Sequence, residues 1–312
     1  MHGKRKNVTK EFGNLNFSEE MACYLILIVP IVGFLVFILY PYLWAGKWSF
    51  FNYTGVASQT RFVGWENFIN IFTKDKSYWH AWLVTLKFTM LKLPIEIPLA
   101  LLLATILQKD SLRGKGIFRS VYYLPSIISV AIVGAIFSNL FDFRGVINSC
   151  LMRFNIIQRP IDWFADYSTS MAVLLTASIW LSFGVNVLYF MAALSNVPVE
   201  LYEAASVEGA GRIRKFFSIT LPMIAPVFQT ILLLAINGTL QTGEFIIVLS
   251  NGAPGGTTFT VGAYLINAFV PGFATGSPNI GYGSALSLVT SVFYCLIAVA
   301  YMKVSTRLAN NS

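Results

Sequence analysis

Charged residues are scarce in this sequence. Of its 312 residues only 12% are Asp, Glu, Lys or Arg, whereas 56% are hydrophobic and the mean hydropathy is +0.66. A soluble domain carries about 25% charged residues, so this chain has too little polar surface to cover its apolar residues in water. The composition therefore predicts an integral membrane protein.

Residues typical of catalytic and metal sites are also rare. There are two histidines, His2 and His80, and the three cysteines Cys23, Cys150 and Cys295 stand too far apart for metal-ligand spacing. The sequence contains no G-x-x-x-x-G-K-[ST], G-x-S-x-G or H-E-x-x-H pattern, so a P-loop for ATP and two common hydrolase sites are excluded. We expect no catalytic residues, no metal and no cofactor in this chain.

Apolar stretches of about 20 residues are needed to cross the hydrocarbon core of a bilayer. Stretches of this kind occur at 21–43, 82–107, 120–141, 170–194, 223–249 and 281–303. The first is too long for the apolar region of a signal peptide and no A-x-A cleavage site follows it, so we expect it to remain as the first span. We predict an all-α membrane domain with six transmembrane helices.

Basic residues outnumber acidic ones by 22 to 14, and their places predict the orientation. With the N-terminus inside, segments 1–20, 108–119, 195–221 and 304–312 hold twelve basic residues, whereas the longer outer segments 44–81, 142–169 and 250–280 hold seven. The positive-inside rule then puts both termini in the cytoplasm, with 1–20 and 304–312 as tails of a six-span domain at 21–303. Basic residues in short loops suit anionic lipid headgroups rather than nucleic acid.

The inner loop at 195–221 has the most specific local pattern. Asn196 is suited to cap a helix, and Gly209 is suited to end it because glycine accepts the left-handed conformation. A second short helix would contain Phe216 and Phe217 and end before Pro222. The pattern predicts a helix, a glycine bend and a second helix on the inner membrane face.

The same loop resembles a family motif. Glu203-Ala204-Ala205, Gly209, Ile219 and Leu221-Pro222 stand at the spacing of the EAA motif of binding-protein-dependent ABC importer permeases, although Glu208 stands where Asp is usual. In that family the loop forms coupling helices that dock into a cytoplasmic ATPase subunit. The resemblance implies a coupling role for Glu203, Ala204, Ala205, Gly209, Phe216, Phe217, Leu221 and Pro222.

Three more stretches resemble the carbohydrate branch of this family, the maltose and glycerol-phosphate type. They are FVGWENF at 62–68, RGKGIFR with YLP at 113–125, and LSNGAP at 249–254. The resemblance implies the transmembrane domain of a type I ABC importer in a prokaryotic plasma (inner) membrane. It would pass a sugar or oligosaccharide inward by alternating access. Implied partners are a second permease chain, a cytoplasmic ATPase dimer that holds ATP and Mg, and an extracytoplasmic solute-binding protein.

Polar residues inside the spans are candidates for the substrate path, because a polar side chain in hydrocarbon is costly unless it is paired or faces water. Ser178, Ser182 and Asn186 repeat every four residues and share a helix face. The fifth span contains Asn237, Gly238, Thr239, Gln241, Thr242 and Glu244, and the third contains Ser126 and Ser129. By the resemblance, Gly238, Thr239 and Thr242 lie opposite sugar-contacting positions. The alternative is hydrogen bonding between helices.

The second span contains the charged residues Lys87, Lys92 and Glu96. Lys92 and Glu96 are one helical turn apart and are expected to pair, while Pro94 and Pro98 interrupt the helix locally. One interpretation is a buried salt bridge, and the other is that Lys92 meets an acidic sugar such as a uronate or a sugar phosphate. Lys87 is placed to reach the outer interface.

Two further classes of function stay open beside the importer. A membrane enzyme is disfavoured by the missing motifs. A self-contained channel or secondary transporter has candidate ion sites at Glu96 and Glu244 but leaves the inner loop unexplained.

Overall fold

The computed structural model describes residues 17–56, 58, 60–108, 114–270, 272–274 and 278–310, which are mostly helical. In chain order the α-helices are α1 (Phe17–Phe34), α2 (Tyr40–Trp48), α3 (Glu66–Thr73), α4 (Lys76–Leu107), α5 (Lys115–Ile127), α6 (Val130–Leu140), α7 (Val146–Arg153), α8 (Tyr167–Ser195), α9 (Val199–Val207), α10 (Arg212–Lys215), α11 (Leu221–Leu240), α12 (Glu244–Ser250), α13 (Val261–Phe269) and α14 (Ile280–Asn310). Two π-helical turns, η2 (Leu35–Leu39) and η4 (Phe216–Thr220), join α1 to α2 and α10 to α11.

Among these residues, five helical segments are long and apolar enough to cross a membrane. They are Tyr24–Trp48, Lys76–Leu107, Tyr167–Ser195, Arg212–Leu240 and Ile280–Arg307. A sixth span results if α5 and α6 are counted together, but these helices meet at 97° because the backbone of Ile128 and Ser129 is extended between them. The all-α, multi-span fold class is therefore confirmed.

Two predicted spans differ in detail from the structure. The stretch 120–141 is bent rather than straight. In the stretch 223–249 the helix ends at Leu240 and α12 begins at Glu244, so the polar run breaks the span. The two prolines of the second span, by contrast, do not interrupt α4, which is continuous from Lys76 to Leu107.

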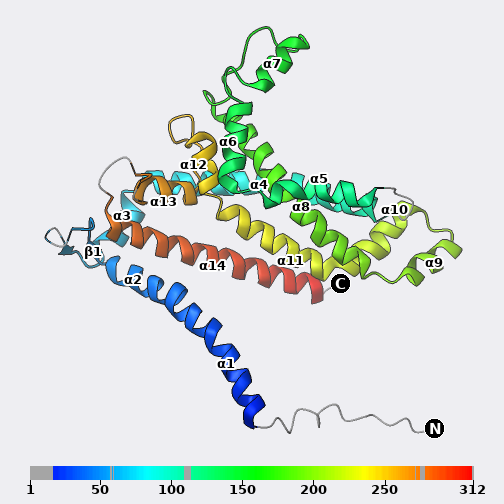
Figure 1. Ribbon diagram of the computed structural model, residues 1–312, viewed down its shortest axis with the longest axis horizontal. Helices are drawn as coiled ribbons and strands as arrows, with labels where there is room; N and C mark the ends of the chain where they lie inside the picture. Colours follow the sequence, from blue (N-terminus) through cyan, green and yellow to red (C-terminus); the bar gives the residue numbers. More distant parts are fainter. Residues whose placement is uncertain are drawn as a thin grey trace.

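The long helices α4, α8, α11 and α14 form the bundle (Figure 1). Three apolar clusters hold it together. Phe190 belongs to the cluster between α4, α8 and α11, Leu174 to the cluster between α4, α6, α8, α12 and α13, and Leu286 to the cluster that joins α14 to α3, α4 and α13. At one end lie α9 and α10, and at the other lie α3, α13 and the short strands (Figure 1). The predicted inner loop 195–221 and the predicted outer segments that carry α3 and α13 therefore lie at opposite ends, whereas the predicted outer segment 142–169 carries α7 away from the bundle (Figure 1).

Asn67 organises the chain before α3, where β1 (Phe51–Asn52) pairs antiparallel with β2 (Arg61–Phe62) in the register Phe51↔Phe62. Its buried amide donates hydrogen bonds to the carbonyl oxygens of Ser49 at 2.8 Å and Phe51 at 3.1 Å. Gly64 has a φ of +54° just before it. Gly64 and Asn67 of the FVGWENF stretch therefore have structural roles in this chain.

Asp75 joins three helices at the same end. Its carboxylate accepts hydrogen bonds from the phenols of Tyr264 in α13, at 3.0 and 3.1 Å, and Tyr282 in α14, at 2.9 Å, and it caps α4 through the backbone N–H of Tyr78. Burial, together with the nearby Asp75 charge, raises the pKa of Tyr264 well above its usual range. The phenol therefore stays protonated and keeps donating.

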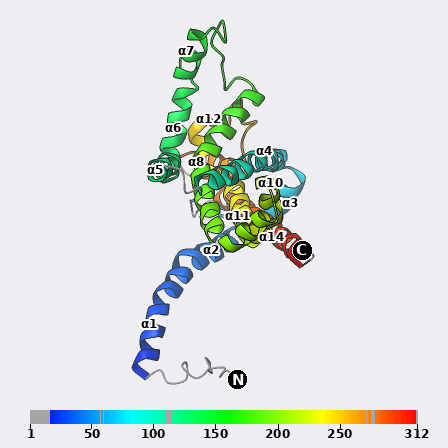
Figure 2. The same cartoon turned by 90° about the vertical axis from the view of Figure 1, so that its right-hand side faces the viewer.

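Two parts of the chain stand away from the bundle. One is α1, which α2 joins to the bundle beside α14, and the other is α7, which α6 joins to it. The helices α1 and α7 project in opposite directions in both views (Figures 1 and 2). None of the most apolar window of Tyr24–Trp48 is buried. These helices therefore offer apolar surface that lipid or another chain must cover.

The crossing of α5 over α8 depends on Gly184. A Cβ atom at Gly184 would lie 2.2 Å from the carbonyl oxygen of Tyr122, and Ser126 donates to the carbonyl oxygen of Leu181 beside it at 3.0 Å. Substituting Gly184→Leu should therefore push the two helices apart and cost about 1–3 kcal/mol or more of stability. The matched control is Gly116→Ala in α5, where a Cβ atom meets nothing within 4 Å.

The measurement is the thermal unfolding midpoint of each purified variant in detergent. A lowered midpoint for Gly184→Leu with no change for Gly116→Ala is expected. An unchanged midpoint for Gly184→Leu would contradict the close packing of these helices.

Candidate functional site

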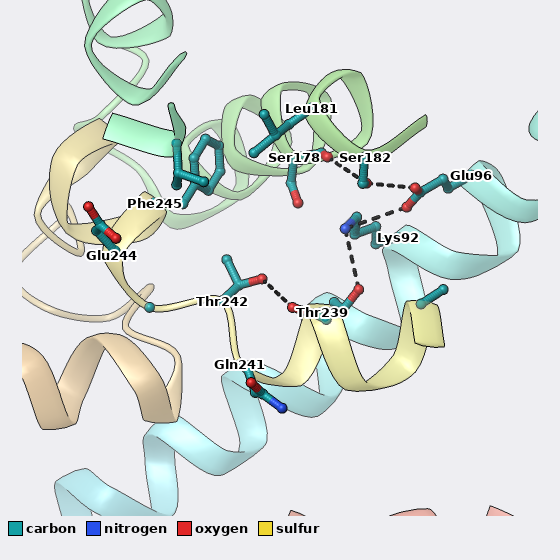
Figure 3. Close-up of a pocket in the computed structure, with 14 residues that line it drawn as sticks. Lys92, Glu96, Ser178, Leu181, Ser182, Thr239, Gln241, Thr242, Glu244 and Phe245 are labelled. Carbon is teal, nitrogen blue, oxygen red and sulfur yellow. Dashed lines mark hydrogen bonds and ion pairs between the residues drawn. The ribbon is translucent and has the colours of Figure 1, made fainter. Parts of the chain in front are cut away.

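A cavity of about 320 Å³ lies between α4, α6, α8, α11 and α12, where α11 ends (Figure 3). This volume falls at the lower end of the range of small-molecule sites, roughly 300–1,000 Å³. The predicted residues that line it are Lys92, Glu96, Ser178, Ser182, Gly238, Thr239, Gln241, Thr242 and Glu244. The wall is completed by Val130, Leu181, Ala235, Gly243 and Phe245. Gly243 belongs to the polar run of the fifth span, whereas the other four carry no sequence signal, because nothing distinguishes them from other small or apolar residues of the spans.

The break between α11 and α12 creates this space. The carbonyl oxygen of Gly238 accepts a hydrogen bond from the Thr242 hydroxyl at 3.1 Å, and the Thr260 hydroxyl donates to the carbonyl oxygen of Thr242. Gly243 lies against the backbone of α13, where a Cβ atom would come within 2.6 Å of the carbonyl carbon of Gly262. The polar run thus turns the chain and exposes Gln241, Thr242 and Glu244 to the cavity.

Lys92 and Glu96 form an ion pair at the cavity, with Nζ and Oε2 3.5 Å apart. Both side chains are almost fully buried, and Lys92 Nζ also lies 3.3 Å from the hydroxyl of Thr239 in α11. Glu96 Oε1 accepts hydrogen bonds from the Ser182 hydroxyl at 2.6 Å and the Asn186 amide at 2.7 Å. The pairing therefore ties α4 to α8 and α11 (Figure 3).

Four other predicted path residues are placed differently. Asn186 contacts Glu96 but does not line the cavity, and the side chain of Ser126 bonds to α8 instead. Ser129 is exposed at the junction of α5 and α6, and Asn237 lies beside the lining residues of α11 without joining them. Small polar residues are expected either to line the substrate path or to form hydrogen bonds between helices, and Ser126 does the latter.

At the α9 end of the bundle, the loop has the predicted helix and glycine bend. The second helix does not end before Pro222 as predicted, because α10 continues through η4 into α11 and Pro222 is accepted in the first turn of α11. Gly209 has a φ of +76°, and the N–H of Ala210 donates to the carbonyl oxygen of Ala205 at 2.8 Å, as at a glycine-terminated helix end. The Asn196 prediction is wrong, because its amide bonds back to Ala192 at the end of α8 and the residue before α9 is Pro198. The end of α8 at Ser195 and the start of α9 at Val199 are only a few residues apart. The sequence alone therefore does not show to which of the two helices Asn196 belongs.

The loop presents both charged and apolar side chains to its surroundings. Glu203 and Ala204 are exposed, as are Val207, Ile213 and Phe217, with exposed fractions of 90%, 77% and 61% for the last three. Other side chains hold the loop to the bundle: Phe216 and Leu221 pack against the apolar cluster, and the hydroxyls of Tyr202 and Thr220 lie 2.8 Å apart. Pro222 is exposed in the first turn of α11.

Comparison with known protein families identifies the family of this chain. Residues 96–309 match the model of the binding-protein-dependent transport system inner membrane component. The chain belongs to this family. The matched part includes the candidate cavity from Glu96 onward and the whole EAA loop, so the resemblance drawn from that loop is confirmed.

Curated relatives place this permease among those for carbohydrates. It is 33% identical to the probable ABC transporter permease protein YesP of Bacillus subtilis over 294 residues, which is 93% of this chain and 92% of the relative. It is 32% identical to the arabinooligosaccharides transport system permease protein AraP of the same species, over 94% of this chain and 91% of the relative. The chain is therefore a multi-pass membrane permease subunit of the sugar importer type, and not an enzyme.

Solved structures have the same fold. A bacterial ABC transporter involved in the import of the acidic polysaccharide alginate matches with a TM-score of 0.79, over 93% of this chain and 96% of that chain. A second structure shows an alginate transporter with an alginate pentasaccharide-bound periplasmic protein, again with a TM-score of 0.79. Both are 22% identical to this permease. They therefore establish the type I fold, and the substrate class has to be argued from the residues of the site.

The ion pair predicts a specific pattern of stabilities. Substituting Glu96→Leu leaves the buried Lys92 without its counter-charge and should cost about 3–5 kcal/mol. The double variant Lys92→Met with Glu96→Leu removes both charges and should recover most of that loss. Thermal unfolding of the purified permease in detergent measures both. A double variant as unstable as the single one would show that charge pairing is not the reason for the arrangement.

Proposed function

We propose that this permease passes a saccharide from an extracytoplasmic binding protein to the cytoplasm by alternating access, driven by ATP hydrolysis in a separate subunit. One observation carries the proposal. The helical segment Arg212–Leu240 begins in the EAA loop and ends at the cavity, a span of roughly 40 Å for 29 residues at 1.5 Å each. A displacement of the loop would therefore reach Thr239 at the cavity through one continuous helical segment.

The partner at the loop is proposed to be a cytoplasmic ATPase dimer, which holds ATP and Mg. Exposed apolar side chains such as Val207 and Ile213 are costly in water and favour a docked protein. The carboxylate of Glu203 stands among them on the exposed side of α9, where it is placed to meet a basic group. This permease itself is proposed to hold no cofactor.

A second permease chain is proposed to complete the pathway. The helix α1 diverges from the bundle (Figures 1 and 2), and Tyr24–Trp48 buries none of its most apolar window within this chain. An apolar helix of this length in a membrane favours packing on a neighbouring chain. The solute-binding protein is proposed at the end that carries α3 and α13, which the orientation of both termini in the cytoplasm would place outside.

The buried Lys92 gives one reason to consider an alternative substrate, an acidic sugar or sugar phosphate. The fold shared with the alginate importer is compatible with an acidic substrate.

A channel or a secondary transporter would not need the exposed EAA loop. Co-purification of the permease with an ATPase subunit distinguishes an importer from a channel and from a secondary transporter.

Two substitutions in the loop test the coupling. Glu203→Lys reverses the charge offered to the partner, and losing one member of such a pair costs about 2–5 kcal/mol of docking. Gly209→Val forces a branched side chain into a φ of +76°, which strains the bend. Both should reduce sugar-stimulated ATP hydrolysis by the reconstituted transporter with its binding protein to near the unstimulated rate.

The matched control is Gly211→Val, because Gly211 has a φ of −70° and a ψ of 168° that valine adopts freely and open space around it. This variant should stay coupled. Normal stimulation in both Glu203→Lys and Gly209→Val would remove the loop from the transmission path.

A further inference from the structure

The cavity is lined by one cationic and two acidic side chains among the described residues. Among the described residues that line it, three are ionisable: Lys92, Glu96 and Glu244. The one cation already has a carboxylate oxygen 3.5 Å from its nitrogen. Glu244, exposed at the start of α12, adds a second negative charge on the opposite wall (Figure 3).

The pair is held in place and is not free to open for a substrate. Ser182 and Asn186 both donate to Glu96 Oε1, which leaves Oε2 directed at Lys92. Lys92 has a further contact to Thr239 on the other side. Since the carboxylate is fixed from α8 and the ammonium from α11, neither group turns away without breaking hydrogen bonds inside the membrane, which is costly.

A substrate carboxylate would gain little here. Placed beside Lys92 it would also lie beside Glu96, and the attraction of one would be cancelled by the repulsion of the other. It would lose its hydration on entering and would meet the field of Glu244 as well. The uncharged donors and acceptors of Ser178, Gln241 and Thr242, with Phe245 and Leu181 as apolar surface, instead match the hydroxyls and apolar faces of a neutral sugar ring.

We infer that the Lys92–Glu96 pair makes this wall of the cavity electrostatically neutral and selects uncharged saccharides over acidic ones. The inference rests on the proposed function, whose substrate class it narrows. Lys92 is a positioning residue for Glu96 and Thr239, and not a receptor for anions.

The test measures the charge of the cavity directly. In a chain with Cys23, Cys150 and Cys295 replaced by serine, Thr242→Cys places a thiol in the cavity. The assembled transporter in membrane vesicles is labelled with anionic, neutral and cationic methanethiosulfonates, and each rate is divided by the rate with free mercaptoethanol. The anionic reagent should react no faster than the neutral one. Adding Glu96→Gln should raise its relative rate about five- to tenfold, and adding Lys92→Gln should lower it by a similar factor.

The control is Lys87→Gln, which removes a lysine from the same helix at an exposed position outside the cavity and should leave the ratio unchanged. Glu244→Gln removes a negative charge at an exposed position and leaves the buried Lys92–Glu96 pair intact. It should therefore raise the relative rate of the anionic reagent. A several-fold preference for the anionic reagent in the Thr242→Cys parent would overturn the inference and make Lys92 an anion site.

An uptake arm separates this inference from the proposed function. ATP-driven uptake by the complete transporter is measured with maltotriose and with trigalacturonate, which have the same length and differ in charge. Faster uptake of maltotriose than of trigalacturonate supports the inference. Preferred uptake of trigalacturonate overturns it while the importer assignment stands. ATP-independent uptake of either sugar overturns the proposed function, whatever the labelling ratio.

Discussion

A charge inside a membrane-spanning helix must find a counter-charge and hydrogen-bond partners, and the Lys92–Glu96 pair is where this chain satisfies that requirement. The partners come from α8 and α11 as well as α4, so the three helices must meet at one level. The apolar cluster around Phe190 fills the space between the same helices. Packing holds the bundle together, and the ion pair fixes how the helices are aligned along their length.

This alignment places the break after Leu240 beside the ion pair. Thr239, the last buried polar residue before the break, contacts Lys92, and the chain then turns through Gln241, Thr242 and Gly243 into α12. Because α11 continues back through η4 and α10 into the EAA loop, the cavity and this loop lie at the two ends of one helical segment. That geometry suits a transporter in which a movement at the inner face changes access to a site within the membrane.

Sequence reasoning predicted the multi-span helical fold and the glycine bend, because long apolar stretches are visible in the residue types and glycine is the residue that accepts the positive φ found at Gly209. It also singled out Lys92, Glu96 and eleven polar or glycine residues as site candidates, and seven of the eleven line the cavity with the ion pair. Ser126, Ser129, Asn186 and Asn237 do not line it, since a helix face is not enough to say which side chain reaches a cavity. The 97° bend between α5 and α6 and the apolar wall of Leu181 and Phe245 depend on tertiary packing and left no local signal.

Blocking the cavity tests the central claim that it is the substrate path. Thr239 is 1% exposed and lines a space of about 320 Å³, so Thr239→Trp should fill it. Leu234→Trp, on the same helix at a 51% exposed position, is the matched control. The measurement is ATP-driven uptake of maltotriose and arabinotriose by the complete transporter in proteoliposomes. We expect Thr239→Trp to reduce uptake at least about tenfold, a barrier rise of about 1.4 kcal/mol, while Leu234→Trp transports normally. Undiminished uptake by an assembled Thr239→Trp transporter would contradict the account.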